Sequence, residues 1–304
     1  MYAFLFPGQG SQFVGMGRQL YDAHPAARAI FDQADSALDL SVSALCFDGP
    51  EDALNDTYNT QPAILAVSTA ALHVMRKCGL DSPSYVAGHS MGEFSALVAA
   101  GVLSFEDGLR VVRERGRLMK QAGEQNPGGM AAIIALDREE VESACTLACQ
   151  ETGEYVGIAN DNCPGQIVIS GNVCALEKAM EETKGRGAKI AKRLAVSISS
   201  HSPLMTEAAD EFRRLLEATP FNAPSVPVVA NATAQPITDP DAIRDAVGQQ
   251  LTSPVHWTDS MCWMIEQGVT RFYEVGPKDV LTGLTKRINR EVERLTTDDA
   301  VNPA

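Results

Sequence analysis

A stretch of thirteen residues, YVAGHSMGEFSAL at positions 85–97, constrains the fold of this chain more than any other. A short apolar run leads into Gly88-His89-Ser90-Met91-Gly92, and residues with helical apolar periodicity follow. This is the order of a strand, a sharp turn and a helix, in which a G-x-S-x-G motif holds a serine exposed on a strained turn. Glycines suit the two flanking positions because they lack a Cβ and let strand and helix approach closely. The motif predicts a nucleophilic serine; the alternative is a glycine-flanked serine in an ordinary loop.

The charge and the cysteine content narrow the class of protein. The formal net charge is −14 and the pI is near 4.8, which argues against non-specific binding to nucleic acid because such binding needs a basic face. The seven cysteines include no C-x-x-C pair, so we expect neither a disulfide framework nor a zinc site. We find no signal peptide and no apolar run near the ~20 residues that span a bilayer. We therefore expect a protein of the reducing cytoplasm that does not enter a membrane.

Two basic segments run against this acidic balance. Residues 184–193 (KGRGAKIAKR) hold five basic and no acidic residues, and residues 286–290 (KRINR) hold three basic residues. Such segments are usually solvated faces of a protein. The alternative is that they attract an acidic partner despite the negative net charge.

The order of the expected elements indicates an α/β protein in which a small domain is inserted into a larger one. Residues 126–196 predict the order strand, helix, strand, strand, helix, strand, which is typical of a ferredoxin-like domain. Residues 1–125 and 197–304 then form a discontinuous large domain, expected to be α/β-hydrolase-like with a parallel sheet. We expect its last strand at 271–275 and a frayed tail at 296–304.

A glycine-rich loop, PGQGSQ at residues 7–12, follows the first expected strand. It fits neither common phosphate-binding template. The dinucleotide fingerprint needs a glycine where Phe13 stands, and the P-loop needs Lys and then Ser or Thr where Met16 and Gly17 stand. We expect the loop to bring backbone N–H groups close to some other ligand.

One of the five histidines is the best candidate for the base that would serve Ser90. His89 is adjacent to the serine across the turn, so we expect it to point away and make a structural hydrogen bond. His201 precedes an expected helix start at Ser202-Pro203 and stands on a loop, where side chains can meet a ligand. The histidines at 24, 73 and 256 have the surroundings of surface or packing residues. No acidic residue stands out to complete a triad, so a dyad oriented by a carbonyl oxygen is the simpler interpretation.

One arginine of the helix expected at 104–121 stands on its apolar side. The residues three and four positions from Arg115 include Val111, Val112, Leu118 and Met119. The side chain either extends past the apolar face to solvent, or its guanidinium points into a pocket for a carboxylate. The pattern alone favours neither.

Eight segments in a fixed order carry a resemblance to a known family. They are FPGQGSQ at 6–12, TQPAI at 60–64, GHSMGE at 88–93, RGRLM at 115–119, GGMAAI at 128–133, PGQIVISG at 164–171, SHSPLM at 200–205 and YEVGP at 273–277. Together they resemble the malonyl-CoA:acyl carrier protein transacylases of fatty-acid synthesis and the related acyltransferase domains of polyketide synthases. The chain departs mildly at Met91 and Phe94, where the family often has Leu and Tyr.

The resemblance implies a ping-pong transfer of malonate from malonyl-CoA to the pantetheine thiol of acyl carrier protein, with no metal and no cofactor. Ser90 would be the acylated nucleophile, and His201 its base and then its acid. Arg115 would clamp the free carboxylate of malonate. The other implied roles are an oxyanion hole from the N–H groups of Gln9 and Met91, orientation of the histidine by the main-chain carbonyl of Gln250, and contacts at the pocket edge from Asn160 and Asn162.

The choice of acyl unit and the rival functions stay open. In the polyketide branch a bulky aromatic before the histidine is associated with rejection of α-methyl groups, and Ser200 supplies no such bulk, so we expect a malonyl preference without exclusivity. One alternative is a trans-acting polyketide acyltransferase with relaxed extender-unit choice. A serine thioesterase or hydrolase is another, against which Arg115 and the loop at 6–12 argue, and a non-catalytic docking protein for acyl carrier protein is a third. We expect a monomer.

Overall fold

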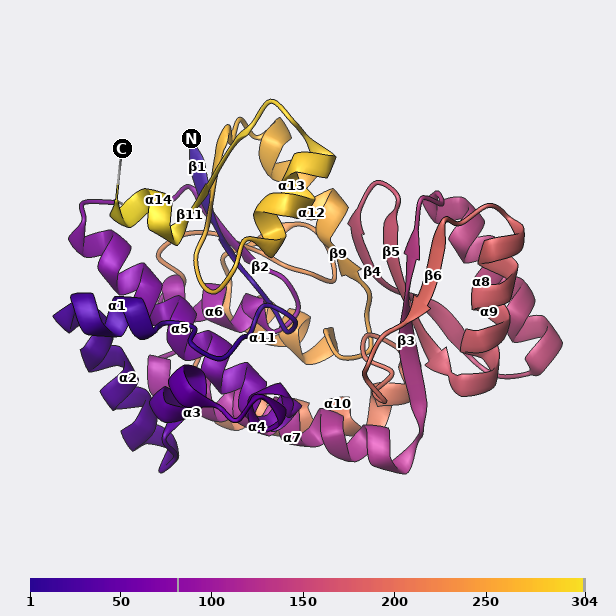
Figure 1. Cartoon of the computed structure of the whole chain (residues 1–304), viewed down its shortest axis with the longest axis horizontal. Helices are drawn as coiled ribbons and strands as arrows, with labels where there is room; N and C mark the ends of the chain where they lie inside the picture. The colour runs from indigo at the N-terminus through magenta and orange to yellow at the C-terminus, as the bar shows by residue number, and fades with distance from the viewer. Residues whose placement is uncertain (81, 303–304) are drawn as a thin grey trace.

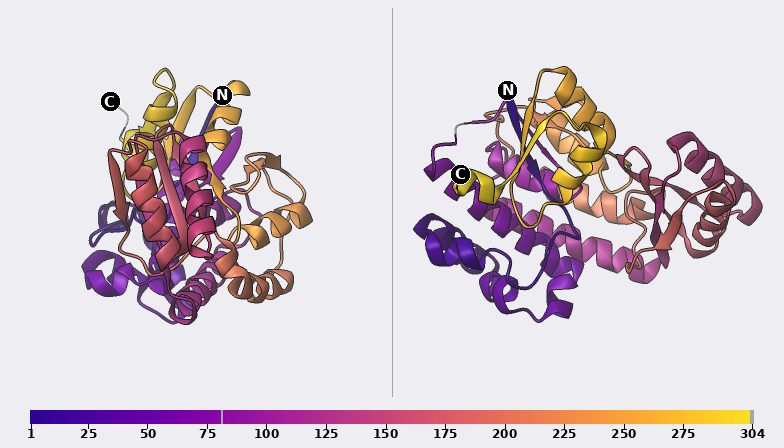
Figure 2. Two further views of the ribbon diagram at one scale, coloured as in Figure 1. Left: turned by 90° about the vertical axis from the view of Figure 1, so that its right-hand side faces the viewer. Right: turned by 45° about the horizontal axis from the view of Figure 1, so that its top comes forward.

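The structure is a computed structural model that describes residues 1–80 and 82–302, and it consists of two bodies side by side (Figure 1). The larger body surrounds a six-stranded sheet with strand order β11-β10-β1-β2-β7-β8. The smaller body is a five-stranded sheet with order β6-β3-β5-β4-β9, and two helices, α8 and α9, cover one of its faces (Figure 2). Among the described residues, no helix is both long and apolar enough to cross a membrane.

The larger body is built from both ends of the chain. Its N-terminal part contains β1 (Tyr2–Phe6), α1 (Arg18–Ala23), α2 (Pro25–Leu38), α3 (Val42–Asp48), α4 (Glu51–Asn55), α5 (Thr57–Lys77), β2 (Tyr85–Gly88), α6 (Gly92–Ala99) and α7 (Phe105–Gln125). Its C-terminal part contains the 3₁₀ helix η1 (Pro203–Met205), α10 (Thr206–Ala218), β7 (Val228–Val229), β8 (Pro236–Ile237), α11 (Pro240–Gln249), α12 (Trp257–Glu266), β10 (Arg271–Glu274), α13 (Val280–Ile288), β11 (Glu293–Thr296) and α14 (Thr297–Val301).

The central strands of the large sheet are buried on both faces. Successive side chains of a strand point to opposite faces, and those of β1 divide accordingly between two apolar clusters. Phe4 and Phe6 join the cluster that contains α5, α6 and α7, whereas Ala3 and Leu5 join the one that contains α12 and α13. This arrangement fixes the carboxyl ends of β1 and β2 next to each other at one edge of the core.

Three expectations about the large body were wrong in detail. The sheet is not wholly parallel, because β8 pairs antiparallel with β7 at its edge. The strand at 271–275 is not the last, since β11 follows and pairs parallel with β10. The tail expected to be frayed forms α14, whose first turn is closed by a capping box between Thr296 and Asp299. Residues 303 and 304 of that tail lie outside the described residues.

The smaller body has the expected order of elements. It contains β3 (Gly128–Ile134), α8 (Arg138–Thr152), β4 (Val156–Cys163), β5 (Gln166–Asn172), α9 (Val173–Gly185) and β6 (Ile190–Arg193). These four strands pair antiparallel with one another. The sequence did not indicate the fifth strand, β9 (Val255–His256), which comes from the C-terminal part of the chain and pairs parallel with β4 through Asn160 and Asp161. It ties the small sheet to the large body at the edge nearest the site.

The turn between β2 and α6 has the strained geometry that the motif predicts. Ser90 has a φ of 52°, in the left-handed region that non-glycine residues seldom occupy. The flanking glycines are required by close approach: a Cβ on Gly88 would lie 1.9 Å from the Gly92 carbonyl oxygen, and one on Gly92 would lie 2.1 Å from the Phe6 carbonyl oxygen. The end of β1 therefore presses directly against the start of α6.

This contact predicts the effect of two glycine substitutions. Gly92→Ala should destabilise the protein by about 3 kcal/mol or more, because the backbone of β1 must move to admit a methyl group. Gly283→Ala, in α13, is the matched control, since a Cβ there meets no atom within 4 Å, and it should be neutral or stabilising by up to about 1 kcal/mol. Urea unfolding of both variants measures the difference; equal stabilities would contradict the close approach.

Candidate active site

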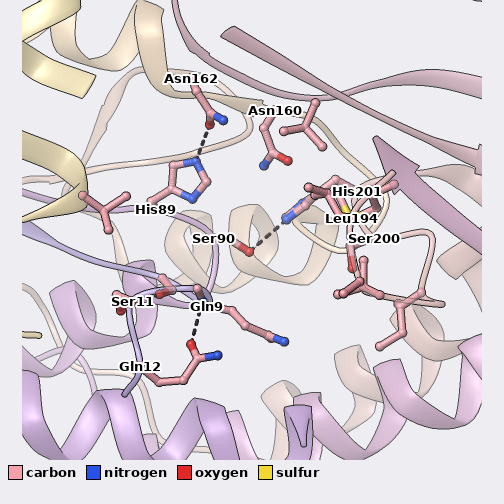
Figure 3. A pocket seen from close by; sticks show the side chains of 18 of the residues that line it. Gln9, Ser11, Gln12, His89, Ser90, Asn160, Asn162, Leu194, Ser200 and His201 are labelled. Carbon is pink, nitrogen blue, oxygen red and sulfur yellow. Dashed lines mark hydrogen bonds between the residues drawn. The ribbon is translucent and has the colours of Figure 1, made fainter. Parts of the chain in front are cut away.

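Ser90 and His201 meet at the carboxyl edge of the large sheet. The Ser90 Oγ lies 2.9 Å from the His201 Nε2, and both side chains face the same cavity (Figure 3). The His201 Nδ1–H donates to the Gln250 carbonyl oxygen at 2.8 Å and to that of Ser253 at 3.2 Å. Because carbonyl oxygens only accept, Nδ1 carries the proton and Nε2 offers its lone pair to the serine hydroxyl. The pair is the expected dyad oriented by a carbonyl.

The surroundings of His201 keep its imidazole neutral. The residue is 2% exposed, and burial, together with the positive charge of Arg115, lowers its pKa to about 3. A neutral imidazole is the form that can accept a proton. His201 is therefore available as a base throughout the physiological range of pH.

Arg115 points toward the dyad instead of extending to solvent. It is 1% exposed, and its Nη2 donates to the Ser90 Oγ at 3.3 Å and to the Gln250 Oε1 at 2.7 Å, while Nη1 donates to the Gln61 Oε1 at 3.0 Å. Burial lowers its pKa to about 10, and the nearby Glu93 acts in the opposite direction. Its Nε has no partner among the described residues. The guanidinium is thus a buried cation with an unused donor, directly behind the serine.

Gln250, which follows α11, contacts every part of the site. Its main-chain carbonyl holds His201, as expected. Its side chain does more than was predicted: Oε1 accepts from Arg115, and Nε2 donates to the Ser90 carbonyl oxygen at 3.0 Å and to a carboxylate oxygen of Glu93. One residue therefore holds His201, Arg115 and the turn that carries Ser90.

Three residues at the site were not assigned a role from the sequence: Gln61, Glu93 and Asn231. Asn231 accepts from the Ser90 N–H at 2.7 Å and donates to the Gly88 carbonyl oxygen at 2.6 Å, which braces the strained turn. Gln61 and Glu93 stand within the segments TQPAI and GHSMGE, so their motifs carried a signal. Asn231 stands 141 residues from Ser90 in the chain, and no local pattern indicates it.

The two asparagines expected at the pocket edge lie on β4 and line the cavity. They differ in what they do there. The Oδ1 of Asn162 lies 2.7 Å from the Nε2 of His89, so that side chain holds the histidine next to Ser90 (Figure 3). This is the structural hydrogen bond expected of His89. Asn160 faces the cavity with no side-chain hydrogen bond among the described residues.

The residues expected to form an oxyanion hole come from two segments, the loop after β1 and the start of α6. Gln9 lines the cavity in the glycine-rich loop, and its side chain donates to the Thr57 hydroxyl at 3.1 Å. The Met91 side chain is buried in the core, and its backbone N–H precedes α6, where the first N–H groups of a helix lack intrahelical partners. Neither N–H has an acceptor among the described residues. Both donors are available to a ligand.

The cavity in front of the dyad has a volume of about 580 Å³ and lies between the two bodies. Apolar side chains from the small body and its connection (Met130, Val168, Leu194) form one wall, and Val280 and Leu281 of α13 contribute on the other side. Ser200 also lines it, and it brings no aromatic bulk. Arg115 is not part of the lining; it lies behind Ser90. No group of three or more side chains able to hold a metal ion occurs among the described residues.

A serine hydroxyl in hydrogen-bond contact with a neutral histidine, and N–H donors without an acceptor among the described residues, are the parts that an acyl-transferring site needs. The family model described as "Acyl transferase domain" matches residues 3–301. The chain belongs to this family and is an acyltransferase.

Relatives of known activity are similar over almost the whole chain. The malonyl CoA-acyl carrier protein transacylase of Escherichia coli (strain K12) is 46% identical over 303 residues, which are 100% of this chain and 96% of the relative. That of Bacillus subtilis (strain 168) is 45% identical, covering 98% of this chain and 93% of the relative.

Solved structures agree with the fold. An acyl carrier protein S-malonyltransferase from Vibrio cholerae superposes with a TM-score of 0.94 at 45% identity, covering 97% of this chain and 96% of that one. A malonyl-transacylase solved in complex with a type II polyketide synthase acyl carrier protein (PlMCAT:AntF) gives a TM-score of 0.96 at 42% identity, covering 100% of this chain and 99% of that one.

The low pKa of His201 predicts the charge state of the free enzyme. Since burial and Arg115 hold that pKa near 3, the imidazole should stay neutral between about pH 8 and pH 5, where an unperturbed histidine becomes charged. NMR of protein labelled with ¹³C-histidine, assigned by comparison with His201→Ala, measures this directly. A His201 resonance that titrates near pH 6.5 would contradict the electrostatic account.

Proposed function

We propose that this acyltransferase moves a malonyl group from malonyl-CoA to the pantetheine thiol of acyl carrier protein through a malonyl ester of Ser90. The observation that carries the proposal is the buried guanidinium of Arg115, whose Nη2 lies 3.3 Å from the Ser90 Oγ. A site for neutral acyl chains has no use for a buried cation at this position. The names of the similar transacylases support the same reaction.

In the first half-reaction, His201 accepts the Ser90 proton on Nε2 while Oγ attacks the thioester carbonyl. The resulting oxyanion is held by the N–H groups of Gln9 and Met91, for which the lack of intramolecular acceptors is the support. An oxyanion-hole donor contributes roughly 3 to 4 kcal/mol in such reactions. The C–S bond then breaks, and His201 protonates the departing CoA thiolate, which leaves a malonyl ester on Ser90.

The second half-reaction runs the same chemistry in reverse order. The neutral His201 takes the proton of the pantetheine thiol, the sulfur attacks the ester carbonyl, and Ser90 leaves with the proton that the histidine returns. The Gln250 and Ser253 carbonyl oxygens, which accept from Nδ1–H, stabilise the imidazolium during each step. Every group in this scheme belongs to one chain, and the scheme uses no cofactor, which supports a monomer as the working unit.

Arg115 selects acyl groups that end in a carboxylate. In the free enzyme its donors meet neutral acceptors on Gln61, Gln250 and Ser90, and its Nε meets none. A carboxylate forms charge-assisted bonds with a guanidinium that are stronger than bonds to neutral oxygens. An acetyl group offers nothing to this donor, so its transfer lacks that stabilisation. Ser200 leaves room beside the α-carbon, so we propose malonyl preference without strict exclusion of a methyl-substituted unit.

The carrier protein is proposed to bind at the cavity mouth, over β6. Leu194 lines the cavity and is 36% exposed, and Ile190 on β6 is 50% exposed. Ile190 lies within the basic segment 184–193 and Leu194 directly follows it, which suits an acidic partner. The solved complex of a similar malonyl-transacylase with a type II polyketide carrier protein supports this class of partner. A polyketide carrier protein is therefore an alternative to a fatty-acid carrier protein as the partner.

The architecture also supports finer assignments. We propose that residues 126–196 are a ferredoxin-like insert in an α/β-hydrolase-like domain formed by residues 1–125 and 197–304. The supporting features are the antiparallel order β6-β3-β5-β4 and the strand–turn–helix that carries Ser90. The proposed boundaries leave β9, which belongs to the large domain in sequence, as the strand that joins the two sheets.

Intact mass spectrometry tests the proposed reaction. Incubation with malonyl-CoA should add one malonyl group to the protein, and holo acyl carrier protein should then remove it and gain it. Ser90→Ala should abolish the addition. Ser95→Ala, a neighbouring buried serine on α6, is the control and should still be labelled. Labelling of Ser90→Ala would overturn the nucleophile, and loss of the label to water at the same rate without carrier would indicate a hydrolase.

A further inference from the structure

Glu93 is a buried carboxylate to which the proposed reaction assigns no step. It stands in the first turn of α6, three residues after the nucleophile, and is 2% exposed. Its Oε1 accepts from the Asn231 N–H at 3.1 Å, and its Oε2 accepts from the Gln250 Nε2. Both oxygens are therefore occupied by N–H donors, which an ionised carboxylate can satisfy because it only accepts.

The position of Glu93 fixes which way the Gln250 amide points. The amide lies between Glu93, which only accepts, and Arg115, which only donates. Its NH₂ must therefore face Glu93 and its oxygen must face Arg115, and this is the arrangement observed, with the Arg115 Nη2 at 2.7 Å from the Gln250 Oε1. Turned by half a rotation, the amide would set oxygen against carboxylate and NH₂ against guanidinium.

In the same arrangement, Glu93 compensates the charge of Arg115 without forming a hydrogen bond to its guanidinium. Glu93 acts electrostatically on Arg115, and the two side chains are joined through Gln250 instead of by direct contact. A direct pair would take both prongs of the guanidinium fork, since carboxylates bind arginine in a bidentate manner. With a neutral amide between them, the charge is compensated while the Arg115 Nε stays unpaired.

We propose that Glu93 is a positioning residue for acyl selectivity, which holds Arg115 ready for the substrate carboxylate by fixing the orientation of the Gln250 side-chain amide. This inference rests on the proposed malonyl transfer. His201 is held by the main-chain carbonyl of Gln250, so the amide can turn without releasing the base. Glu93 therefore acts on the choice of acyl group far more than on the proton transfers.

The decisive variant is Glu93→Gln. A glutamine offers one acceptor oxygen where the N–H groups of Asn231 and Gln250 now point, so one of these two donors loses its acceptor. The orientation of the Gln250 amide is then held less firmly, by the Ser90 carbonyl oxygen and Arg115 alone. We expect the KM for malonyl-CoA to rise at least about tenfold, while kcat/KM for the slow acylation by acetyl-CoA changes less than about threefold. The ratio of malonyl to acetyl acylation, measured by mass spectrometry of the protein, should fall accordingly.

Two further variants make the result interpretable. Glu274→Gln is a matched control, because Glu274 is also fully buried, accepts from the N–H groups of Leu281 and Thr282 at 2.9 and 2.7 Å, and has a pKa raised by burial to about 7. It should lose thermal stability and keep the wild-type ratio. Arg115→Ala should lose selectivity altogether. If Arg115→Ala keeps the ratio, the proposed clamp fails; if it lowers the ratio and folded Glu93→Gln does not, only the role of Glu93 fails.

The pH dependence of selectivity gives a readout that does not depend on stability. Burial raises the pKa of Glu93 to about 7, with Arg115 on α7 as the charged group that opposes this. His89 and His201 stay neutral because burial lowers the pKa of each. Protonation of Glu93 below pH ~7 replaces an acceptor with a donor, so the Gln250 amide is no longer held by two acceptor oxygens.

The ratio of malonyl to acetyl acylation by the wild-type protein should therefore fall as the pH drops through that value, and Glu93→Gln should give a flat profile. A flat wild-type profile, or an unchanged step in the variant, would overturn the proposal.

Discussion

The side-chain amide of Gln250 is the interaction on which the site depends. A strained serine turn, a neutral imidazole and a buried guanidinium come from distant parts of the chain, and this residue contacts all three. The two contacts of the side-chain amide are possible because Glu93 and Arg115 face its opposite ends and favour one orientation. The main-chain carbonyl holds His201 whichever way the amide points. Buried polar networks of this kind are costly when incomplete and specific when every donor and acceptor is matched. The Arg115 Nε, which has no partner among the described residues, is the exception, and in the proposed reaction a substrate carboxylate would compensate the charge of this guanidinium.

The two bodies contribute different parts of the site. The large sheet positions the polar groups of the site. β1 ends in the loop that carries Gln9, and β2 ends in the turn at Ser90. The start of α6 presents N–H groups without backbone acceptors beside that turn. The small sheet supplies a wall of the cavity through Met130, Val168 and the segment after β6. Because β9 pairs with β4 and its His256 N–H donates to the carbonyl oxygen of Asn231, which also braces the Ser90 turn, backbone hydrogen bonds link the wall to the site. In the proposed reaction Arg115 would select the acyl group, while the apolar wall would be left for the thiol-bearing arm.

Local patterns predicted much of this, and long-range contacts set the rest. The strand, turn and helix around Ser90, the N-cap of α7 at Ser104 and the element order of the small body follow from short-range rules of glycine, capping and periodicity. The orientation of the Arg115 side chain could not be predicted from the sequence. An arginine on an apolar helix face can either extend to solvent or point into a pocket, and only the fold decides between the two. Asn231 and β9 contact partners far away in the chain, and short strands carry too little pattern to be seen. The helix α14 did have a signal, because Thr296 and Asp299 have the spacing of a capping box.

A crystal structure of Ser90→Ala with bound malonyl-CoA tests the central claim most directly. The account predicts that the free carboxylate of the malonyl group lies within about 2.7 to 2.9 Å of guanidinium nitrogens of Arg115, the distances of charge-assisted pairs. It also predicts that the Gln250 amide keeps its NH₂ on Glu93 and its oxygen on Arg115. A carboxylate directed to solvent, with Arg115 bonded only to Gln61 and Gln250 as in the free protein, would contradict it.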